Sequence, residues 1–165
     1  MHVRLSRGAG SAALAALLGL GPAALEAWRL SDAAKAGFRE IWHASVADRR
    51  ERVGCLGGII AMDTVHVDSV RLLPDGESDS LTAGAEVSLS QCAAPGWIGT
   101  VHTHVRSTDD DVPVARFSPG DRAVMSAWSK RYARAGAFCV LYSAKGAHCE
   151  VWPSRARPRV VRPGG

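Results

Sequence analysis

The segment from Trp97 to Trp152 constrains the fold most, because its pattern changes from strand type to helix type and back. Residues 97–105 (WIGTVHTHV) form an apolar run that predicts a strand. Ser118-Pro-Gly-Asp121 is typical of a helix start, since Ser is a favoured N-cap, Pro suits the first turn and an early acid complements the helix dipole. It predicts a helix over residues 119–135, with Ala123, Met125, Ala127, Trp128 and Tyr132 packing inward. A hairpin then follows at residues 137–143 and 148–152, around a turn at 144–146.

The first half of the chain supplies the other main helix and further strands. Ser31-Asp32 predicts a cap for a helix over residues 33–48, and apolar residues recur at helical spacing within it. Those residues are Ala34, Phe38, Ile41, Trp42 and Val46. Strands are predicted at residues 28–30, 53–62, 65–73 and 86–90, with a loop at 74–80. The chain therefore predicts a single α/β domain, with a mixed β-sheet and flanking helices.

The two ends of the chain differ from this domain, which we assign to residues 28–153. Residues 1–27 form an N-terminal apolar segment, in which Arg4 and Arg7 precede a run of Ala, Leu and Gly. This is the outline of a secretory signal peptide, but poor cleavage sites favour a helix instead. The run is too short and too rich in Gly to predict a membrane span.

Residues 154–165 form a basic tail. Four Arg lie between Arg155 and Gly165 with no acid among them, so the rest of the chain balances 16 basic against 16 acidic residues. Such a tail could contact nucleic acid. The composition favours a solvated, disordered end, and we expect no nucleic-acid partner.

The four cysteines contain no Cys-x-x-Cys pair, and three of them lie in apolar, strand-type runs. We expect small buried hydrophobic side chains rather than a disulfide framework. This favours a cytoplasmic location, with secretion directed by residues 1–24 as the alternative.

His102-Thr-His104 indicates a metal site. Side chains two apart on a strand share a face, so both imidazoles can reach one ion. Asp121, from the start of the next helix, would supply a third ligand, and three protein ligands with one open position are typical of catalytic zinc. Asp109, Asp110 and Asp111 offer a fallback ligand or an acidic rim, although a solvated charged loop is favoured.

The order His-x-His, loop, Ser-x-x-Asp resembles the JAMM/MPN+ (JAB domain) metalloproteases, whose pattern also has an upstream Glu before a short Gly-x-Leu strand. Glu51-Arg-Val-Gly54-Cys-Leu56 matches that context. The resemblance covers residues 28–152. It implies the JAB/MPN layout, which is similar to that of cytidine deaminases, and a Zn²⁺ ion held by His102, His104 and Asp121. Glu51 would be the general acid/base, and Ser118 would stabilise the tetrahedral intermediate.

The residue chemistry is consistent with these roles. Glu51 is not one of the implied ligands, and a free carboxylate can move protons for bound water. Glu86 is a weaker second candidate, and Glu40 falls inside the first helix. A hydroxyl at a helix N-cap lies beside free backbone N–H groups, although capping and catalysis require Ser118 to point in different directions.

Two departures from the family pattern lie beside His104. Thirteen residues separate it from Ser118, about six more than usual, and Val105 replaces the usual Pro. A loop can absorb such an insertion.

The resemblance implies hydrolysis of a peptide or isopeptide bond after the C-terminal Gly-Gly of a ubiquitin-like or sulfur-carrier protein. The alternative is a non-catalytic binding or scaffold module on the same fold. Deamination is disfavoured, because the chain lacks the Pro-Cys-x-x-Cys signature.

Overall fold

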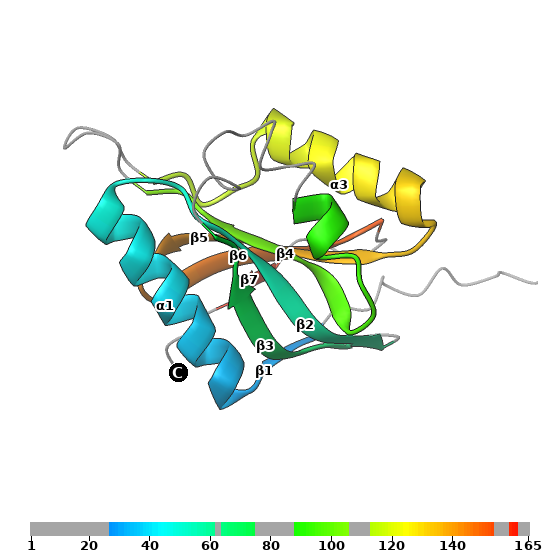
Figure 1. Cartoon of the computed structure of the whole chain (residues 1–165), viewed down its shortest axis with the longest axis horizontal. Coiled ribbons are helices and arrows are strands. Elements are labelled where there is room, and N and C mark those ends of the chain that lie inside the picture. The colour runs from blue at the N-terminus through cyan, green and yellow to red at the C-terminus, as the bar shows by residue number, and fades with distance from the viewer. Residues whose placement is uncertain (1–26, 62–63, 75–87, 106–112, 154–158, 162–165) are drawn as a thin grey trace, which may run out of the picture.

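The computed structural model describes residues 27–61, 64–74, 88–105, 113–153 and 159–161. They form one α/β unit in which helices lie on both faces of a mixed, curled sheet (Figure 1). The labelled elements are β1 (Ala27–Leu30), α1 (Asp32–Asp48), β2 (Val53–Ala61), β3 (Thr64–Leu72), β4 (Trp97–Thr103), α3 (Pro119–Tyr132), β5 (Gly136–Ser143), β6 (Gly146–Trp152) and β7 (Arg159–Val161). The predicted fold class, an α/β domain with a mixed sheet, is confirmed.

The sheet has the strand order β1-β3-β2-β4-β5-β6-β7. Two neighbouring pairs, β1 with β3 and β4 with β5, run parallel, and the other pairs are antiparallel. The central position of β4 follows from its two partners: Val53 of β2 pairs with His102, and Val140 of β5 pairs with His102 on the other side. The candidate ligand strand is therefore held by hydrogen bonds on both edges.

Helix α1 covers one face of the sheet. Ser31 caps it by accepting a hydrogen bond from the Ala34 N–H at 3.0 Å, as the sequence predicts. Its buried face is formed by Ala34, Phe38, Ile41 and Ser45, which recur at helical spacing. Val46, predicted to pack, is instead 49% exposed. A β-carbon at Gly54 would lie 2.6 Å from Ile41 Cδ1, so this strand glycine admits the close approach of the helix, as expected.

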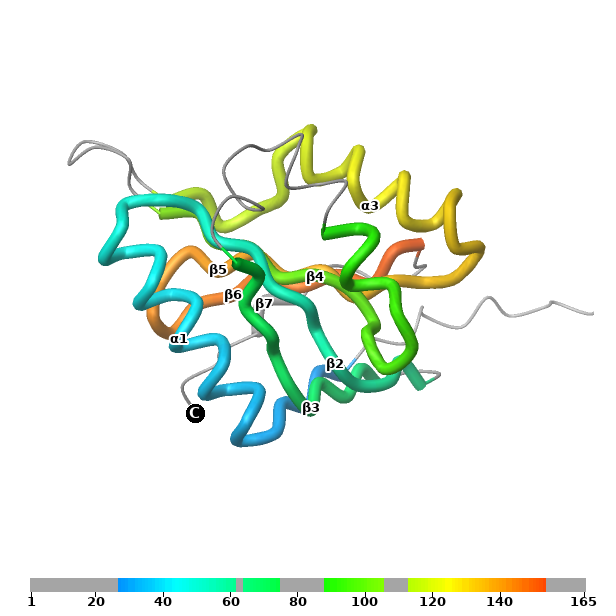
Figure 2. The backbone as a smooth tube through the Cα atoms, viewed as in Figure 1, coloured from blue at the N-terminus to red at the C-terminus, as the bar shows by residue number. Residues whose placement is uncertain are grey.

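Helix α3 covers the opposite face, where a second buried cluster includes Met125, Trp128 and Phe138. Met125 and Trp128 are buried as predicted, whereas Ala123 is exposed. A helical turn at residues 88–91 lies beside α3 (Figure 2), and the Tyr132 hydroxyl donates to the Leu89 carbonyl at 3.0 Å. The two faces of the sheet thus have separate hydrophobic cores.

The strand predicted at residues 86–90 is wrong where the structure describes it. Ser88 accepts a hydrogen bond from the Cys92 N–H at 2.9 Å, which closes a helical turn. Ser88, Leu89 and Cys92 are all buried, a spacing that suits one side of a helix better than alternate positions on a strand. Packing against α3 therefore overrides the local alternation.

The expectation of unpaired cysteines is also wrong. Cys55 forms a disulfide with Cys92, and Cys139 forms one with Cys149. The first joins β2 to the helical turn on the α3 side, across 37 residues of sequence. The second joins residues directly opposite each other on β5 and β6. All four cysteines are buried, including the three for which burial was predicted, but each lies beside a partner that linear spacing did not reveal.

Part of the predicted disordered tail is ordered. Residues Arg159–Val161 form β7 and pair antiparallel with β6, giving that strand a second neighbour. The N-terminal segment up to residue 26, most of the 74–80 loop and Glu86 lie outside the described residues. No helix in the described part of the chain is long and apolar enough to span a membrane.

Candidate metal centre

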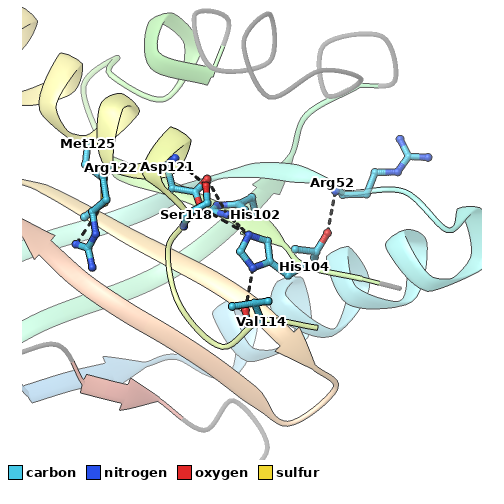
Figure 3. Close-up of polar contacts among 9 residues, drawn as sticks. Arg52, His102, His104, Val114, Ser118, Asp121, Arg122 and Met125 are labelled. Atoms are coloured by element: carbon cyan, nitrogen blue, oxygen red, sulfur yellow. Dashed lines mark hydrogen bonds and ion pairs between the residues drawn. The ribbon is translucent and has the colours of Figure 1, made fainter. Parts of the chain in front are cut away.

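Strand β4 and the first turn of α3 bring His102, His104 and Asp121 together (Figure 3). The two histidines share the α3 face of β4, since side chains two apart on a strand point the same way. Asp121 is the third residue of α3 and lies over the end of that strand. The three side chains are largely buried, with 9 to 14% of each exposed.

The polar atoms of the three side chains face one another closely. His102 Nε2 lies 3.2 Å from His104 Nε2 and 3.2 Å from Asp121 Oδ1. His104 Nε2 lies 3.6 Å from Asp121 Oδ2. This group of one carboxylate and two imidazoles could bind a metal ion.

A hydrogen bond to the ring nitrogen of His104 that points away from the site fixes the tautomer of its neutral imidazole. Its Nδ1 lies 2.8 Å from the Val114 carbonyl oxygen, which can only accept, so Nδ1 carries the proton. In the neutral imidazole Nε2 then has a free lone pair directed toward Asp121. Metal-ligating histidines are oriented in this way by a carbonyl or carboxylate behind the ring.

The electrostatics of the site favour a positive charge at its centre. Burial disfavours the Asp121 carboxylate, but hydrogen bonds with His102 and His104 outweigh burial and hold its pKa well below 3.8. Burial likewise opposes protonation of His104, yet hydrogen bonds to Asp121 and Val114, with the charge of Glu51, raise its pKa above 6.5. Either a proton on His104 or a metal ion would supply the positive charge that the Asp121 carboxylate favours.

Ser118 and Asp121 form a reciprocal capping box at the start of α3. Asp121 Oδ2 accepts from the Ser118 N–H at 2.6 Å, and Ser118 Oγ accepts from the Asp121 N–H at 3.2 Å. The first bond fixes the orientation of the Asp121 carboxylate. The second uses only a lone pair of the Ser118 hydroxyl and leaves its proton to donate elsewhere, so capping does not prevent a catalytic role.

Glu51 lies in the segment between α1 and β2 and shares a cavity with the metal centre. The cavity has a volume of about 400 Å³ and is lined by Glu51, His104, Val105, Pro113, Val114, Arg116 and Ser118. This volume is in the range of ordinary small-ligand pockets. Of the five predicted site residues, His102, His104 and Asp121 thus form one cluster, and Glu51 and Ser118 line the adjoining cavity together with His104.

The long connection between His104 and Ser118 returns to the site at Val114, whose carbonyl orients His104. Asp109, Asp110 and Asp111 lie outside the described residues. Among the described residues, the cluster with metal-ligand spacing takes its acid from α3, as the Ser-x-x-Asp pattern predicts.

A second polar cluster lies next to the metal centre and was not predicted. Glu150 of β6 accepts from both terminal nitrogens of Arg122, one at 2.7 Å, and from His148 Nε2 at 2.8 Å. Burial disfavours its charge, but hydrogen bonds from His148 and Arg122 outweigh burial and lower the pKa of Glu150 to about 2. The buried Phe117 ring separates the clusters, 5.9 Å from His102 and 5.5 Å from His148 between ring centroids.

The spacing of His148 and Glu150 carried a signal for this cluster, because they are two apart on a predicted strand and so share a face. Arg122 follows Asp121 directly, so its ion pair with Glu150 attaches the first turn of α3 to β6. The second cluster therefore supports the position of Asp121.

No protein-family model matches this sequence, and a search of curated proteins also finds no match.

Proposed function

We propose that the protein is a zinc-dependent hydrolase of peptide or isopeptide bonds. The observation that carries the proposal is the spacing of the three ligand atoms. Zinc binds imidazole nitrogen and carboxylate oxygen at about 2.0–2.2 Å with tetrahedral angles, which separates neighbouring ligand atoms by about 3.4 Å. The two Nε2 atoms of His102 and His104 lie 3.2 Å apart, near this value. Each also lies close to one oxygen of Asp121, His102 at 3.2 Å from Oδ1 and His104 at 3.6 Å from Oδ2, and one ligand atom from each residue falls within 4.8 Å of the other two.

The ligand set also suits zinc chemically. Two imidazoles and one carboxylate leave one tetrahedral position free, which is typical of catalytic rather than structural zinc. Zinc bound there would lower the pKa of water to near 7, so that hydroxide is available at neutral pH. The Val114 carbonyl behind His104 and the Ser118 N–H behind Asp121 hold the ligand orientations in advance.

The remaining site residues divide the proton transfers and charge stabilisation between them. Glu51 takes a proton from the attacking water as the oxygen adds to the carbonyl carbon. The Ser118 hydroxyl donates to the developing oxyanion with the proton that capping leaves free. Glu51 then passes its proton to the leaving nitrogen, the C–N bond breaks, and the products are a carboxylic acid and an amine.

The resemblance to JAMM/MPN+ enzymes supports the finer assignment. His102, His104 and Asp121 cluster beside a cavity that Glu51, Ser118 and His104 line, and a mixed sheet with helices on both faces is compatible with the JAB layout. We therefore propose a scissile bond after the Gly-Gly of a ubiquitin-like or sulfur-carrier protein.

Hydrolysis of a ubiquitin-like fusion with an extension after Gly-Gly tests this function. We expect the purified protein to release the extension, a chelator to abolish release, and Glu51→Gln to reduce it to a small residual rate. Glu40→Gln, the same change at an exposed position on α1, serves as the matched control and should retain activity. Activity that survives both the chelator and Glu51→Gln would contradict the mechanism. Zinc binding without hydrolysis would favour the scaffold alternative.

The disulfides bear on location. The prediction of a cytoplasmic location rested on unpaired cysteines, whereas all four cysteines form disulfides. Disulfides persist mainly in oxidising compartments. We therefore propose that the chain functions in such a compartment, and that residues 1–24 direct it there. Thiol titration of denatured protein isolated from its source without reductant would check this: we expect no free thiols, and four would contradict it.

A further inference from the structure

The middle residue of the histidine pair points away from the metal centre. Thr103 is fully buried between β4 and α1, on the opposite face of the sheet from His102 and His104. Its hydroxyl makes a hydrogen bond with the Ser45 hydroxyl in the last turn of α1, and Ser45 is also fully buried. Neither hydroxyl contacts the proposed ligands, so the proposed mechanism leaves this buried pair without a role.

The pair binds the backbone on both sides of Glu51. Ser45 Oγ donates to the Arg50 carbonyl at 2.5 Å, and the Ser45 carbonyl accepts from the Arg50 N–H at 3.1 Å. Thr103 Oγ1 accepts from the Arg52 N–H at 2.8 Å, and the Thr103 N–H donates to the Arg52 carbonyl at 3.0 Å. All four backbone polar groups of the two residues that flank Glu51 are therefore bound to Ser45 or Thr103.

The direction of each hydrogen bond follows from these contacts. Ser45 uses its proton on the Arg50 carbonyl, so it must accept the proton of Thr103. Thr103 in turn accepts from the Arg52 N–H. A single chain of hydrogen bonds thus starts at Arg52, passes through Thr103 and Ser45, and ends at Arg50. Because Ser45, Thr103 and Arg52 are buried and both hydroxyls are already engaged, removing one hydroxyl leaves polar groups on both sides without partners.

Side-chain contacts hold the same segment from outside. Arg52 forms an ion pair with Asp48 at the end of α1, and its side chain extends away from the two histidines (Figure 3). Arg49, the residue after Asp48, ends the helix in the left-handed region at φ 51°. The segment from α1 to β2 therefore has one defined path, and Glu51 projects from it into the cavity that His104 and Ser118 also line.

We infer that Ser45 and Thr103 are positioning residues, which hold Glu51 over the metal centre by linking its flanking backbone to the strand that carries the histidines. The expected effect of these residues on kcat rests on the proposed function. The structural content of the inference, that the two hydroxyls fix residues 50–52, is independent of any reaction.

Three substitutions test the inference kinetically. Thr103→Val keeps the shape of the side chain and removes the hydroxyl, and we expect kcat to fall about 100-fold with KM nearly unchanged, because small misplacements of a catalytic group cost about this much. Thr103→Ser keeps the hydroxyl and should recover most of the rate. Ser45→Ala should resemble Thr103→Val, and the double variant should lose little more than either alone, because both act through one chain of hydrogen bonds.

The decisive comparison uses Glu51→Gln as the background. If Thr103 acts through Glu51, adding Thr103→Val to Glu51→Gln should not slow the residual reaction further. A second loss as large as the first would overturn the inference. A fall in zinc affinity that matches the fall in kcat would also overturn it, because Thr103 would then be positioning the ligands instead.

Amide hydrogen exchange in the metal-free protein separates this inference from the proposed function. We expect the Arg52 amide to be protected in the wild type and Thr103→Ser, and to exchange at least about tenfold faster in Thr103→Val. Equal exchange in all three would refute the positioning role even if the protein hydrolyses its substrate. If the wild type proves inactive, the proposed function fails, and the exchange pattern still decides whether the hydroxyls fix the segment.

Discussion

Glu150→Gln should lower the free energy of unfolding, because Glu150 is a buried carboxylate whose charge has two partners. Its side chain is 8% exposed and receives hydrogen bonds from Arg122 and His148. The native pKa of about 2, against an ordinary 4.5, corresponds to at most about 3.5 kcal/mol at about 1.4 kcal/mol per unit. Since Arg122 is 38% exposed and partly screened by solvent, we expect a loss of about 2 kcal/mol at pH 7.

The pH dependence follows from the direction of the shift. Because the folded pKa is lowered, the stabilisation by Glu150 is complete above pH 4.5 and disappears as the pH falls toward 2. Urea unfolding of wild type and Glu150→Gln at pH 7 and pH 3 measures this, and the difference at pH 3 should be less than half of that at pH 7. Glu40→Gln, on the exposed side of α1, is the matched control and should change stability by less than about 0.5 kcal/mol. A loss below 0.5 kcal/mol for Glu150→Gln, or an equal loss at both pH values, would refute the reasoning.

Two further predictions concern the stability of the fold. Ala133 ends α3 at φ 49°, so Ala133→Gly should raise the free energy of unfolding by about 0.5–1 kcal/mol in urea titrations, and a loss would contradict the backbone argument. Replacing Cys55 and Cys92 by Ala should cost more than replacing Cys139 and Cys149, by about 1 kcal/mol, because the first disulfide closes a loop of 37 residues and the second a loop of 10. Calorimetric melting of the two double variants would check this order, and the reverse order would show that loop length does not determine the difference.

The strand carrying the histidines and the helix carrying Asp121 could be predicted from sequence, because their patterns are local. Alternation of side chains along the strand places His102 and His104 on one face. The Ser118 cap fixes the start of α3, so that Asp121 lies in its first turn. No local rule fixes the path of the thirteen residues between His104 and Ser118. The expectation that the strand and the helix meet came from the metal-ligand chemistry of Asp121 and from the resemblance.

The contacts that the sequence did not predict are of two kinds: pairings that depend on the exact register of two strands, and contacts between a strand and a helix that lie far apart in the sequence. Cys139 illustrates the first case. A regular hairpin closing through Ala144-Lys145 would place Cys139 opposite Glu150, but an irregularity between Leu141 and Ser143 shifts the pairing to Cys149. Thr103 illustrates the second, because its partner Ser45 lies 58 residues away on a helix whose packing no local pattern reveals.

The metal content of purified protein tests the central claim most directly. We expect mass spectrometry to find one zinc ion per wild-type chain and per Glu51→Gln chain, because Glu51 is not a ligand. Asp121→Asn, which keeps the shape of the side chain but removes its charge, should lose zinc affinity by at least about 100-fold. A wild-type chain that takes up no zinc, or an Asp121→Asn chain that binds it as tightly as the wild type, would contradict the proposed metal centre.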